Sequence, residues 1–262
     1  MTWDFRSYHP EGLHNLMILM SERGIPDGYR HMDGFSSHTF KWVNDKGEAF
    51  WVKYHFKTNQ GNKGLPLDKI KDIEHRTLDY ANEDLYENIK KGNFPSWTWY
   101  VQIMPEKDGL DYKYDIFDIT KVWPHGDYPL MPVGQLVLNR IPDNFFAESE
   151  QVALSPTNLV PGIEPSNDRI LQGRIFAYND TQRHRLGASF EQIPINCPYR
   201  CRVDNYQRDG PMIVNGNQGS GHNYEPSSLG GPVPDPKYAW HKYSTPGEVA
   251  RHKFQHPNCD YD

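Results

Sequence analysis

The chain has 262 residues, with 28 Lys and Arg against 34 Asp and Glu, and its formal net charge is −6. That balance argues against a nucleic-acid-binding protein, whose surface would be basic overall or in a large patch. The three cysteines match neither a zinc ribbon nor a disulfide framework, and this indicates a reducing compartment. The sequence shows neither a secretory signal pattern nor an apolar run of membrane-spanning length, so we expect a soluble, intracellular protein.

The first part of the chain predicts a helix followed by a hairpin. Apolar residues recur at helical spacing over 10–23, and Gly24 with Pro26 ends that pattern. Two strand-like runs, SSHTFKWV and EAFWVKYHFK, then flank the turn sequence NDKG at 44–47. We expect these two runs to pair as antiparallel strands.

The middle of the chain predicts more helix and two further strands. The helical pattern covers 67–91 and ends at Gly92, and the later run GQLVLNR predicts a strand over 134–140. Between them, SWTWYVQIM alternates strictly, so its residues divide between two faces. We expect one face to belong to the core and the other to line a pocket or meet solvent. One face carries Trp97, Trp99, Val101 and Ile103, and the other carries Thr98, Tyr100, Gln102 and Met104.

After about residue 144 the regular pattern fades, apart from one helix over about 166–186. Pro165 and Ser166 predict its start, and Gly187 predicts its end. Segments with so little periodicity need other surfaces to pack on, so we expect 144–262 to be a region that wraps around other surfaces, after a first region over 1–143. The tail after Gly216 is rich in Gly, Pro, Asn and His, and we expect it to be irregular.

The motifs of the common enzyme classes are absent from the sequence. It has 12 histidines but no HExxH and no paired Cys and His metal motif, and it has no GxSxG, Walker A or GxGxxG sequence. The stretch RIFAYNDTQRHRLG is more unusual, because a helix would place Arg174, Tyr178, Gln182 and Arg185 on one face. Such a face is suited to hold a tyrosinate. The alternative is a solvated basic helix end with a tyrosine packed beneath it, which would have the same residue types.

The stretch from Arg174 to Gln182 closely resembles the proximal haem motif of the monofunctional haem catalases. Further segments resemble catalase sequence in the same order, and together they cover nearly all of the chain from Trp3 to about Gln218. The likeness is greatest to the small-subunit catalases that carry a nicotinamide cofactor. These segments are RGIPDGYRHMDGFSSHTFKWVN, GNFPSWTWYVQIMP, KVWPHGDYPLMPVGQLVLNR, QVALSPTNLVPGIEPS and QIPINCPYRCRVDNYQRDGP.

This resemblance implies an α+β fold that contains the second half of the catalase antiparallel β-barrel, flanking helices and a wrapping segment. It also implies that Tyr178 ligates the iron of haem b through a tyrosinate oxygen. Arg174 corresponds to the arginine that supports this tyrosinate, with His38 and Asp168 as its further partners. Arg185 corresponds to a residue that pairs with a haem propionate, and Gln182 stands where many relatives have histidine.

The resemblance also implies an NADPH site. Two positions depart from the family, since Ile18 replaces a phenylalanine and Asp33 replaces an asparagine. Arg23 and Lys57 suit the additional phosphate of NADPH, whereas the acidic Asp33 is unfavourable beside it. The positions that match are His14, Ser21, Arg23, Lys57, Val122, Trp123 and His125.

The implied activity is the disproportionation of hydrogen peroxide to water and oxygen. In catalases a distal histidine and asparagine perform the acid-base chemistry, and they belong to a part of the family sequence that precedes this chain. We therefore expect no distal catalytic residue here and a chain that is incomplete at both ends. Two alternatives remain: a catalase-related haem protein that rearranges fatty-acid hydroperoxides, and a non-enzymatic polypeptide that binds NADPH or associates with full-length subunits.

The family also suggests an assembly and a location. Catalases are commonly tetramers, so we expect a homotetramer for the full-length protein, with no membrane or nucleic-acid partner. Eukaryotic relatives are commonly peroxisomal, and a cytoplasmic location is the alternative. The sequence ends in NCDYD, which is not an import signal of the SKL type.

Overall fold

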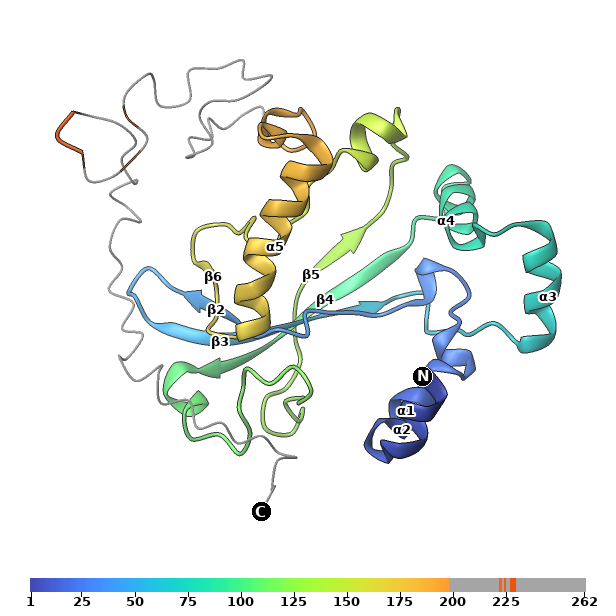
Figure 1. Ribbon diagram of the computed structural model, residues 1–262, viewed down its shortest axis with the longest axis horizontal. Helices are drawn as coiled ribbons and strands as arrows, with labels where there is room; N and C mark the ends of the chain where they lie inside the picture. The colour runs from blue at the N-terminus through green and yellow to red at the C-terminus, as the bar shows by residue number, and fades with distance from the viewer. Residues whose placement is uncertain (198–221, 223, 225–226, 230–262) are drawn as a thin grey trace. The chain divides into compact units, whose positions relative to one another are not determined.

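The computed structural model describes residues 1–197, 222, 224 and 227–229 (Figure 1). The expected irregular tail after Gly216 therefore lies almost entirely outside the described residues. The chain divides into two compact units that interleave along the sequence. The first comprises 1–37, 53–102 and 124–141, and the second comprises 38–52, 103–123 and 142–262. No helix in the described part of the chain is long and apolar enough to cross a lipid bilayer.

Among the described residues, six strands form one sheet in the order β5-β4-β3-β2-β6, with β1 pairing with β3 (Figure 1). The registers of four pairs, β1 with β3, β2 with β3, β2 with β6 and β4 with β5, are all antiparallel. An antiparallel sheet accompanied by helices is the expected α+β class. The strands are β1 (Gly34–Phe35), β2 (Phe40–Val43), β3 (Ala49–Thr58), β4 (Ser96–Pro105), β5 (Met131–Val137) and β6 (Ile163–Pro165).

The predicted hairpin is confirmed as the pair β2 and β3, with Phe40 opposite Val52 and Val43 opposite Ala49. Its turn is built by Asn44, whose side-chain oxygen accepts the N–H groups of Lys46 and Glu48 at 3.0 and 2.9 Å. Gly47 has a φ of 79°, a conformation that L side chains rarely adopt. The first strand is shorter than expected, because residues 36–39 lie outside it.

Strand β4 is buried on both faces, and this corrects the expectation of one core face. Trp97 and Val101 are buried on the first face, and Gln102 and Met104 are buried on the second. Gln102 can be buried because its amide is hydrogen-bonded: its Nε2 donates to the carbonyl of Tyr128 at 2.6 Å.

Strand β5 begins and ends three residues before the predicted 134–140. Its ladder with β4 already starts at Met131, opposite Val101, and shifts register between Trp99 and Tyr100. The chain then leaves the ladder, because the N–H of Leu138 donates to the carbonyl of Pro95. All seven residues of β5 are exposed, so this strand offered no one-sided burial pattern that could fix its ends.

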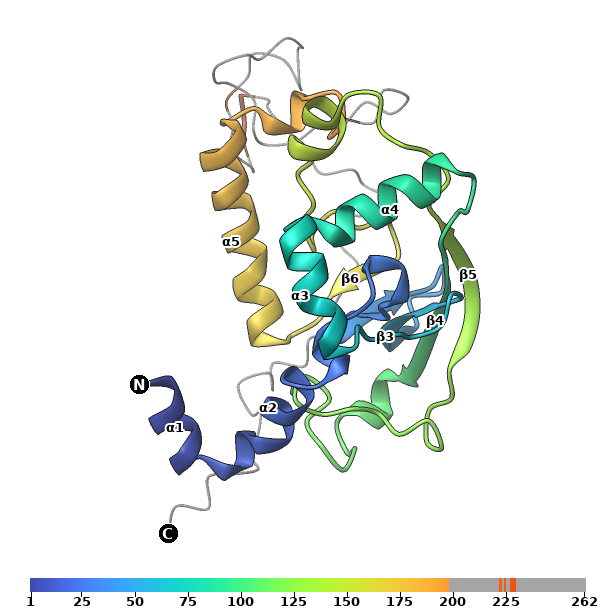
Figure 2. The same cartoon turned by 90° about the vertical axis from the view of Figure 1, so that its right-hand side faces the viewer.

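The predicted helices are present but are more divided than expected. Instead of one helix over 10–23 the chain forms a 3-10 turn (Pro10–Gly12), α2 (Leu13–Leu19) and a second 3-10 turn (Glu22–Gly24), preceded by α1 (Thr2–Tyr8). The region 67–91 forms α3 (Leu67–Arg76) and α4 (Tyr80–Lys90), which follow one another in Figure 2. Thr77 interrupts them, because it is extended and its hydroxyl accepts the N–H of Asp79 at 3.1 Å.

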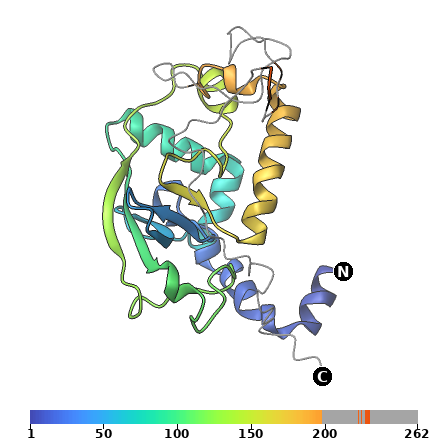
Figure 3. The same cartoon turned by 90° about the vertical axis from the view of Figure 1, so that its left-hand side faces the viewer.

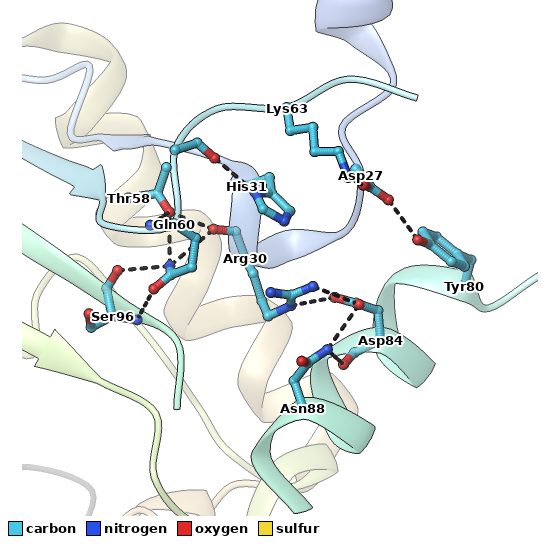
Figure 4. Close-up of polar contacts among 11 residues, drawn as sticks. Asp27, Arg30, His31, Thr58, Gln60, Lys63, Tyr80, Asp84, Asn88 and Ser96 are labelled. Atoms are coloured by element: carbon cyan, nitrogen blue, oxygen red, sulfur yellow. Dashed lines mark hydrogen bonds and ion pairs between the residues drawn. The ribbon is translucent and has the colours of Figure 1, made fainter. Parts of the chain in front are cut away.

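Polar contacts hold α4 to two loops of the first unit (Figure 4). Arg30 donates to both carboxylate oxygens of Asp84, at 2.6 and 2.9 Å. Tyr80 donates to Asp27 at 2.6 Å, and Asp27 also pairs with Lys63. These contacts join residues that lie more than 30 positions apart in the sequence, so they fix the loops on the helix.

Helix α5 (Arg169–Leu186) follows β6 directly in the second unit (Figure 3). The predicted end is confirmed, since Gly187 is its C-cap with a φ of 104°. The predicted start is wrong by about two residues, because Asp168 is the N-cap. The side chain of Asp168 accepts the N–H groups of Ile170 and Leu171 at 2.9 and 3.1 Å, as an N-cap carboxylate commonly does.

Candidate functional site

The start of α5 is anchored to the buried part of the second unit. β6 pairs with β2, so that Phe40 lies opposite Pro165. The Ser166 hydroxyl donates to the carbonyl of Thr39, and the Thr39 hydroxyl donates to the carbonyl of Ile116 at 2.6 Å. Ser166 and Thr39 are both buried. The first turn of the helix, and the candidate residues on it, are thus fixed by the sheet.

His38 and Asp168 form a buried pair at this anchor. His38 Nδ1 lies 2.6 Å from Asp168 Oδ2, and the two residues are only 3% and 1% exposed. The other carboxylate oxygen caps the helix, so both oxygens of Asp168 have donors. A carboxylate at a helix N-terminus also interacts favourably with the helix dipole. The resemblance implied that both residues are partners of Arg174, and in the structure they contact one another.

Arg174 and Tyr178 form a second pair, one turn further along α5. Arg174 Nη2 donates to the Tyr178 hydroxyl oxygen at 2.6 Å, and the guanidinium carbon lies 5.1 Å from the centre of the phenol ring. Both side chains are half-buried. A cationic donor at this distance favours negative charge on the oxygen to which it donates.

The helix face beside Tyr178 is open. Ile170, Ala177 and Thr181 are exposed there, at helical spacings that place them next to Arg174 and Tyr178. On the other side of the tyrosine, Leu171 and Gln182 are the buried residues of the helix. The phenol and the guanidinium therefore lie at the boundary between the protein interior and an exposed strip of α5.

Arg185 is held by neighbouring protein groups. Its Nη2 lies 2.6 Å from the Gln182 side-chain oxygen and 2.7 Å from the Val152 carbonyl, and its Nη1 donates to the Glu150 carbonyl. Gln182 is buried, and its Nε2 donates to the carbonyl of Leu154 at 3.3 Å. The glutamine at this position thus fixes the guanidinium against the segment 150–154, a role that the sequence did not reveal.

The structure distributes the predicted nucleotide residues over both units. His14, Ser21, Arg23, Lys57 and His125 belong to the first unit, and Val122 and Trp123 belong to the second. His14, Arg23 and Val122 are exposed, whereas Trp123 is only 2% exposed. The Ser21 hydroxyl donates to the Ile18 carbonyl at 2.7 Å and accepts the N–H of Arg23 at 3.3 Å.

The negative charge of Asp33 is stabilised by one cationic and two neutral hydrogen-bond donors. Its Oδ2 lies 3.0 Å from Lys57 Nζ and 3.2 Å from the Asn62 amide nitrogen, and its Oδ1 accepts the N–H of Thr58 at 2.8 Å. Burial alone would raise the pKa of Asp33, but these hydrogen bonds and the Lys57 charge outweigh it and lower that pKa. The aspartate that the sequence marks as a departure is therefore an ionised partner of Lys57.

No group of three or more His, Cys, Asp or Glu side chains within the described residues is arranged to bind a metal ion. A tyrosinate that completes the coordination of a porphyrin-bound iron needs no such cluster, because the porphyrin supplies the other ligands. The Arg174 and Tyr178 pair is the geometry that fits this chemistry.

The chain is similar to known proteins of one family. The family model described as Catalase matches residues 1–231. A peroxisomal catalase of Toxoplasma gondii is 54% identical over 265 residues, which cover 100% of this chain and 53% of the relative. A catalase of Methanosarcina barkeri is 55% identical over 261 residues, which cover 100% of this chain and 52% of the relative.

Solved structures extend the likeness to the fold. A bacterial catalase matches with a TM-score of 0.78 and 46% identity, over 87% of this chain and 44% of the other. A fungal catalase matches with a TM-score of 0.77 and 46% identity, over 87% of this chain and 46% of the other. The chain therefore belongs to the catalase family, whose members bind haem through a tyrosine. It spans about half the length of the curated relatives that it matches.

Proposed function

We propose that this chain forms the proximal, tyrosine-bearing side of the haem site in a catalase, an enzyme that converts two hydrogen peroxide molecules into two water molecules and one oxygen molecule. The observation that carries the proposal is the 2.6 Å hydrogen bond from Arg174 to the Tyr178 hydroxyl. This hydrogen bond places the permanently charged guanidinium beside the oxygen atom that would bind iron. Membership of the catalase family supports the same assignment.

The residues present fit the haem group. Ferric iron prefers hard, anionic oxygen ligands, and a phenolate is such a ligand. The exposed strip of Ile170, Ala177 and Thr181 beside Tyr178 offers small and apolar side chains to a flat ligand. Haem, when bound, supplies the iron centre at which peroxide is decomposed.

In this proposal each residue of the proximal side has a distinct task. Tyr178 would hold the haem iron through its phenolate oxygen. Arg174 donates to that oxygen and stabilises its negative charge. Asp168 caps the helix and pairs with His38, so it fixes the first turn of α5. Arg174 lies in the next turn. Arg185 keeps part of its hydrogen-bonding capacity for a carboxylate such as a haem propionate.

Haem titration of the purified chain, and measurement of oxygen evolution from peroxide by a full-length protein that contains it, test the proposal. We expect one haem per chain, and one oxygen molecule for every two peroxide molecules consumed. The variant Tyr178→Phe should lose both properties, whereas Tyr86→Phe, which changes an exposed tyrosine on α4, should keep them. Haem uptake that does not depend on Tyr178 would contradict the proposal.

We also propose that the chain binds NADPH. Lys57 and Arg23 are suited to its phosphates, and His14, Ser21, Val122, Trp123 and His125 match further family positions. Since Asp33 and Lys57 form an ion pair, the phosphate would share the lysine with this carboxylate. Titration with NADPH followed by nucleotide fluorescence tests the site, and Arg23→Gln should weaken binding about tenfold or more through loss of a charged hydrogen bond.

Two wider proposals follow from the family. We propose that the protein functions as a homotetramer, which analytical ultracentrifugation of the haem-loaded protein would test. We further propose a peroxisomal location, because a relative that is 54% identical is named as a peroxisomal catalase. Cell fractionation with a peroxisomal marker would test that location, and a purely cytosolic signal would contradict it.

A further inference from the structure

Three side chains of the first unit surround His55 on or beside β3. Phe35 lies opposite His55 in the pairing of β1 with β3, and their rings meet edge to face with centres 5.6 Å apart. Lys57 Nζ lies 4.5 Å from the centre of the same Phe35 ring. The ring of His125 lies 6.2 Å from that of His55. We refer to Phe35, His55, Lys57 and His125 as the His55 cluster.

The hydrogen bonds of His55 determine where it can accept a proton. Gln102 uses its Nε2 to donate to the Tyr128 carbonyl, so its Oε1 is the atom that meets His55 Nε2 at 2.9 Å. An amide oxygen only accepts hydrogen bonds, and His55 Nε2 must therefore carry a hydrogen. The basic nitrogen of neutral His55 is then Nδ1, and one proton added there makes the ring a cation.

The surroundings of His55 disfavour this cation in the free protein. Burial is the largest cause that lowers the pKa of His55, the hydrogen bond to Gln102 opposes it, and Lys57, His125 and Lys53 lower it further. Lys57 is two residues along the same strand, so its Cα lies about 7 Å from that of His55. That separation is within the Debye length of about 8 Å at physiological ionic strength.

In the described part of the chain, several elements contribute charged or neutral groups around His55. Lys53 and Lys57 come from β3 itself, and His125 comes from the loop before β5. β1 contributes the neutral Phe35, and β4 contributes the neutral Gln102. Asp33 contributes a carboxylate beside this group of residues, and it is already engaged by Lys57 at 3.0 Å. An additional anion beside Lys57 would therefore change the balance of charge that His55 experiences.

We propose that the binding of a phosphate-bearing dinucleotide at Lys57 is coupled to the protonation of His55, so that the site takes up a proton when the nucleotide binds. This inference rests on the proposed NADPH site, to which Lys57 and His125 belong. The phosphates offset the charge of Lys57 and make a second cation favourable nearby. By reciprocal linkage, a proton on His55 strengthens nucleotide binding by the same factor. Nucleotide retention then increases as the surroundings become acidic.

Calorimetric titration of the full chain with NADPH tests this coupling. Titrations between about pH 8 and about pH 5.5, in two buffers that differ in ionisation enthalpy, measure both affinity and proton uptake. We expect affinity to rise as the pH falls, by at most about tenfold per pH unit for one proton. The variant His55→Gln should retain binding at high pH but lose most of the proton uptake. The control His75→Gln, on α3 outside the His55 cluster, should behave as the unmodified chain.

A second measurement needs no variant. Histidine NMR of the unmodified chain follows the ring signals of His55 against pH, with and without NADPH, and binding should shift its titration to higher pH. NADPH binding with a pH-independent affinity, or an unshifted His55 titration, would overturn the coupling and leave the nucleotide site intact. No binding of NADPH at any pH would overturn the proposed nucleotide site and the coupling with it.

Discussion

The Arg174 guanidinium donates to the oxygen of Tyr178 and also lies near its ring, and these contacts define the site at the scale of the residue. Arginine suits this task because it stays charged at every relevant pH and its planar donors have fixed directions. The two residues are four positions apart on one helix, so α5 places their side chains next to each other. The local sequence could therefore place both residues on one helix face, and the resemblance to catalases singled them out as a pair.

Replacement of Arg174 should weaken haem binding more than it weakens folding. A hydrogen bond to a charged group contributes about 1.5–3 kcal/mol, so Arg174→Gln should lower haem affinity about ten- to hundredfold. Arg183→Gln is the matched control, because it removes an exposed arginine of the same helix. Competition for haem with a calibrated acceptor protein gives the affinities. Equal losses in the two variants would contradict a specific role for Arg174.

Other residue contacts could not be predicted from sequence, because they join distant positions. The Asp33 and Lys57 pair spans 24 positions, and Arg185 reaches carbonyls 33 and 35 positions away. Local patterns report which residues share a face of a helix or strand but not which loop covers that face. The family resemblance supplied the candidate residues in these cases, and the structure added their partners.

At the scale of the element, helix α5 depends on one aspartate for two functions. Asp168→Ala removes the N-cap, which costs about 1 kcal/mol, and leaves buried His38 without its carboxylate, which costs about 1–3 kcal/mol more. Urea unfolding should therefore show a loss of about 2–4 kcal/mol. Asp168→Asn should lose less, because asparagine also caps helices.

The control for this prediction lies in the middle of the same helix. Asp180 is exposed, so Asp180→Ala should change the free energy of unfolding by no more than about 0.5 kcal/mol. A similar effect of the two alanine substitutions would mean that the cap and the His38 pair do not stabilise the chain.

The contacts that hold α4 should make stability depend on pH at both extremes (Figure 4). Burial raises the pKa of Asp27, but the hydrogen bonds and charge from Lys63 and Tyr80 outweigh it and bring that pKa below its ordinary 3.8. The hydrogen bond to Asp27, followed by burial, raises the pKa of Tyr80 from 10.0 to about 12. The Asp27 contribution is thus present above pH 3.8 and is lost as the pH falls through the lowered pKa.

The contribution of Tyr80 to stability depends on pH in the opposite direction. It is present below pH 10.0 and is lost as the pH rises through about 12. The free energies of unfolding of the unmodified chain and of Tyr80→Phe should therefore differ most between the lowered pKa of Asp27 and the raised pKa of Tyr80. Outside this pH range the two free energies should converge. Tyr86→Phe provides the control on the same helix. A constant difference between Tyr80→Phe and the unmodified chain across the whole pH range would contradict this account.

The elements themselves were predicted with uneven success, for physical reasons. The turn at Asn44 and the end of α5 at Gly187 require particular backbone conformations, so their sequences identify them. The ends of β5 were wrong because every residue of that strand is exposed. The break at Thr77 was missed because it has neither Gly nor Pro, and a threonine hydroxyl makes the local turn instead.

At the scale of the whole molecule, the second unit contains the residues of the proposed haem site, and the first contains the residues of the proposed proton coupling. Phe40, Val52 and Leu171 bury apolar side chains in the second unit, together with the hydrogen-bonded Ser166 and Asp168. Helix α5 is therefore fixed at its start, while Ile170, Ala177 and Thr181 on its strip are exposed. The fold class followed from the sequence, but this division into interleaved units depends on distant contacts.

Resonance Raman spectroscopy of the haem-loaded chain tests the central claim most directly, namely that Tyr178 ligates the iron. We predict the vibrations of an iron-bound tyrosinate in the unmodified chain and in Tyr86→Phe, and their loss in Tyr178→Phe. The same tyrosinate vibrations in Tyr178→Phe, or a histidine-ligated spectrum in the unmodified chain, would contradict the assignment of α5 as the proximal haem helix.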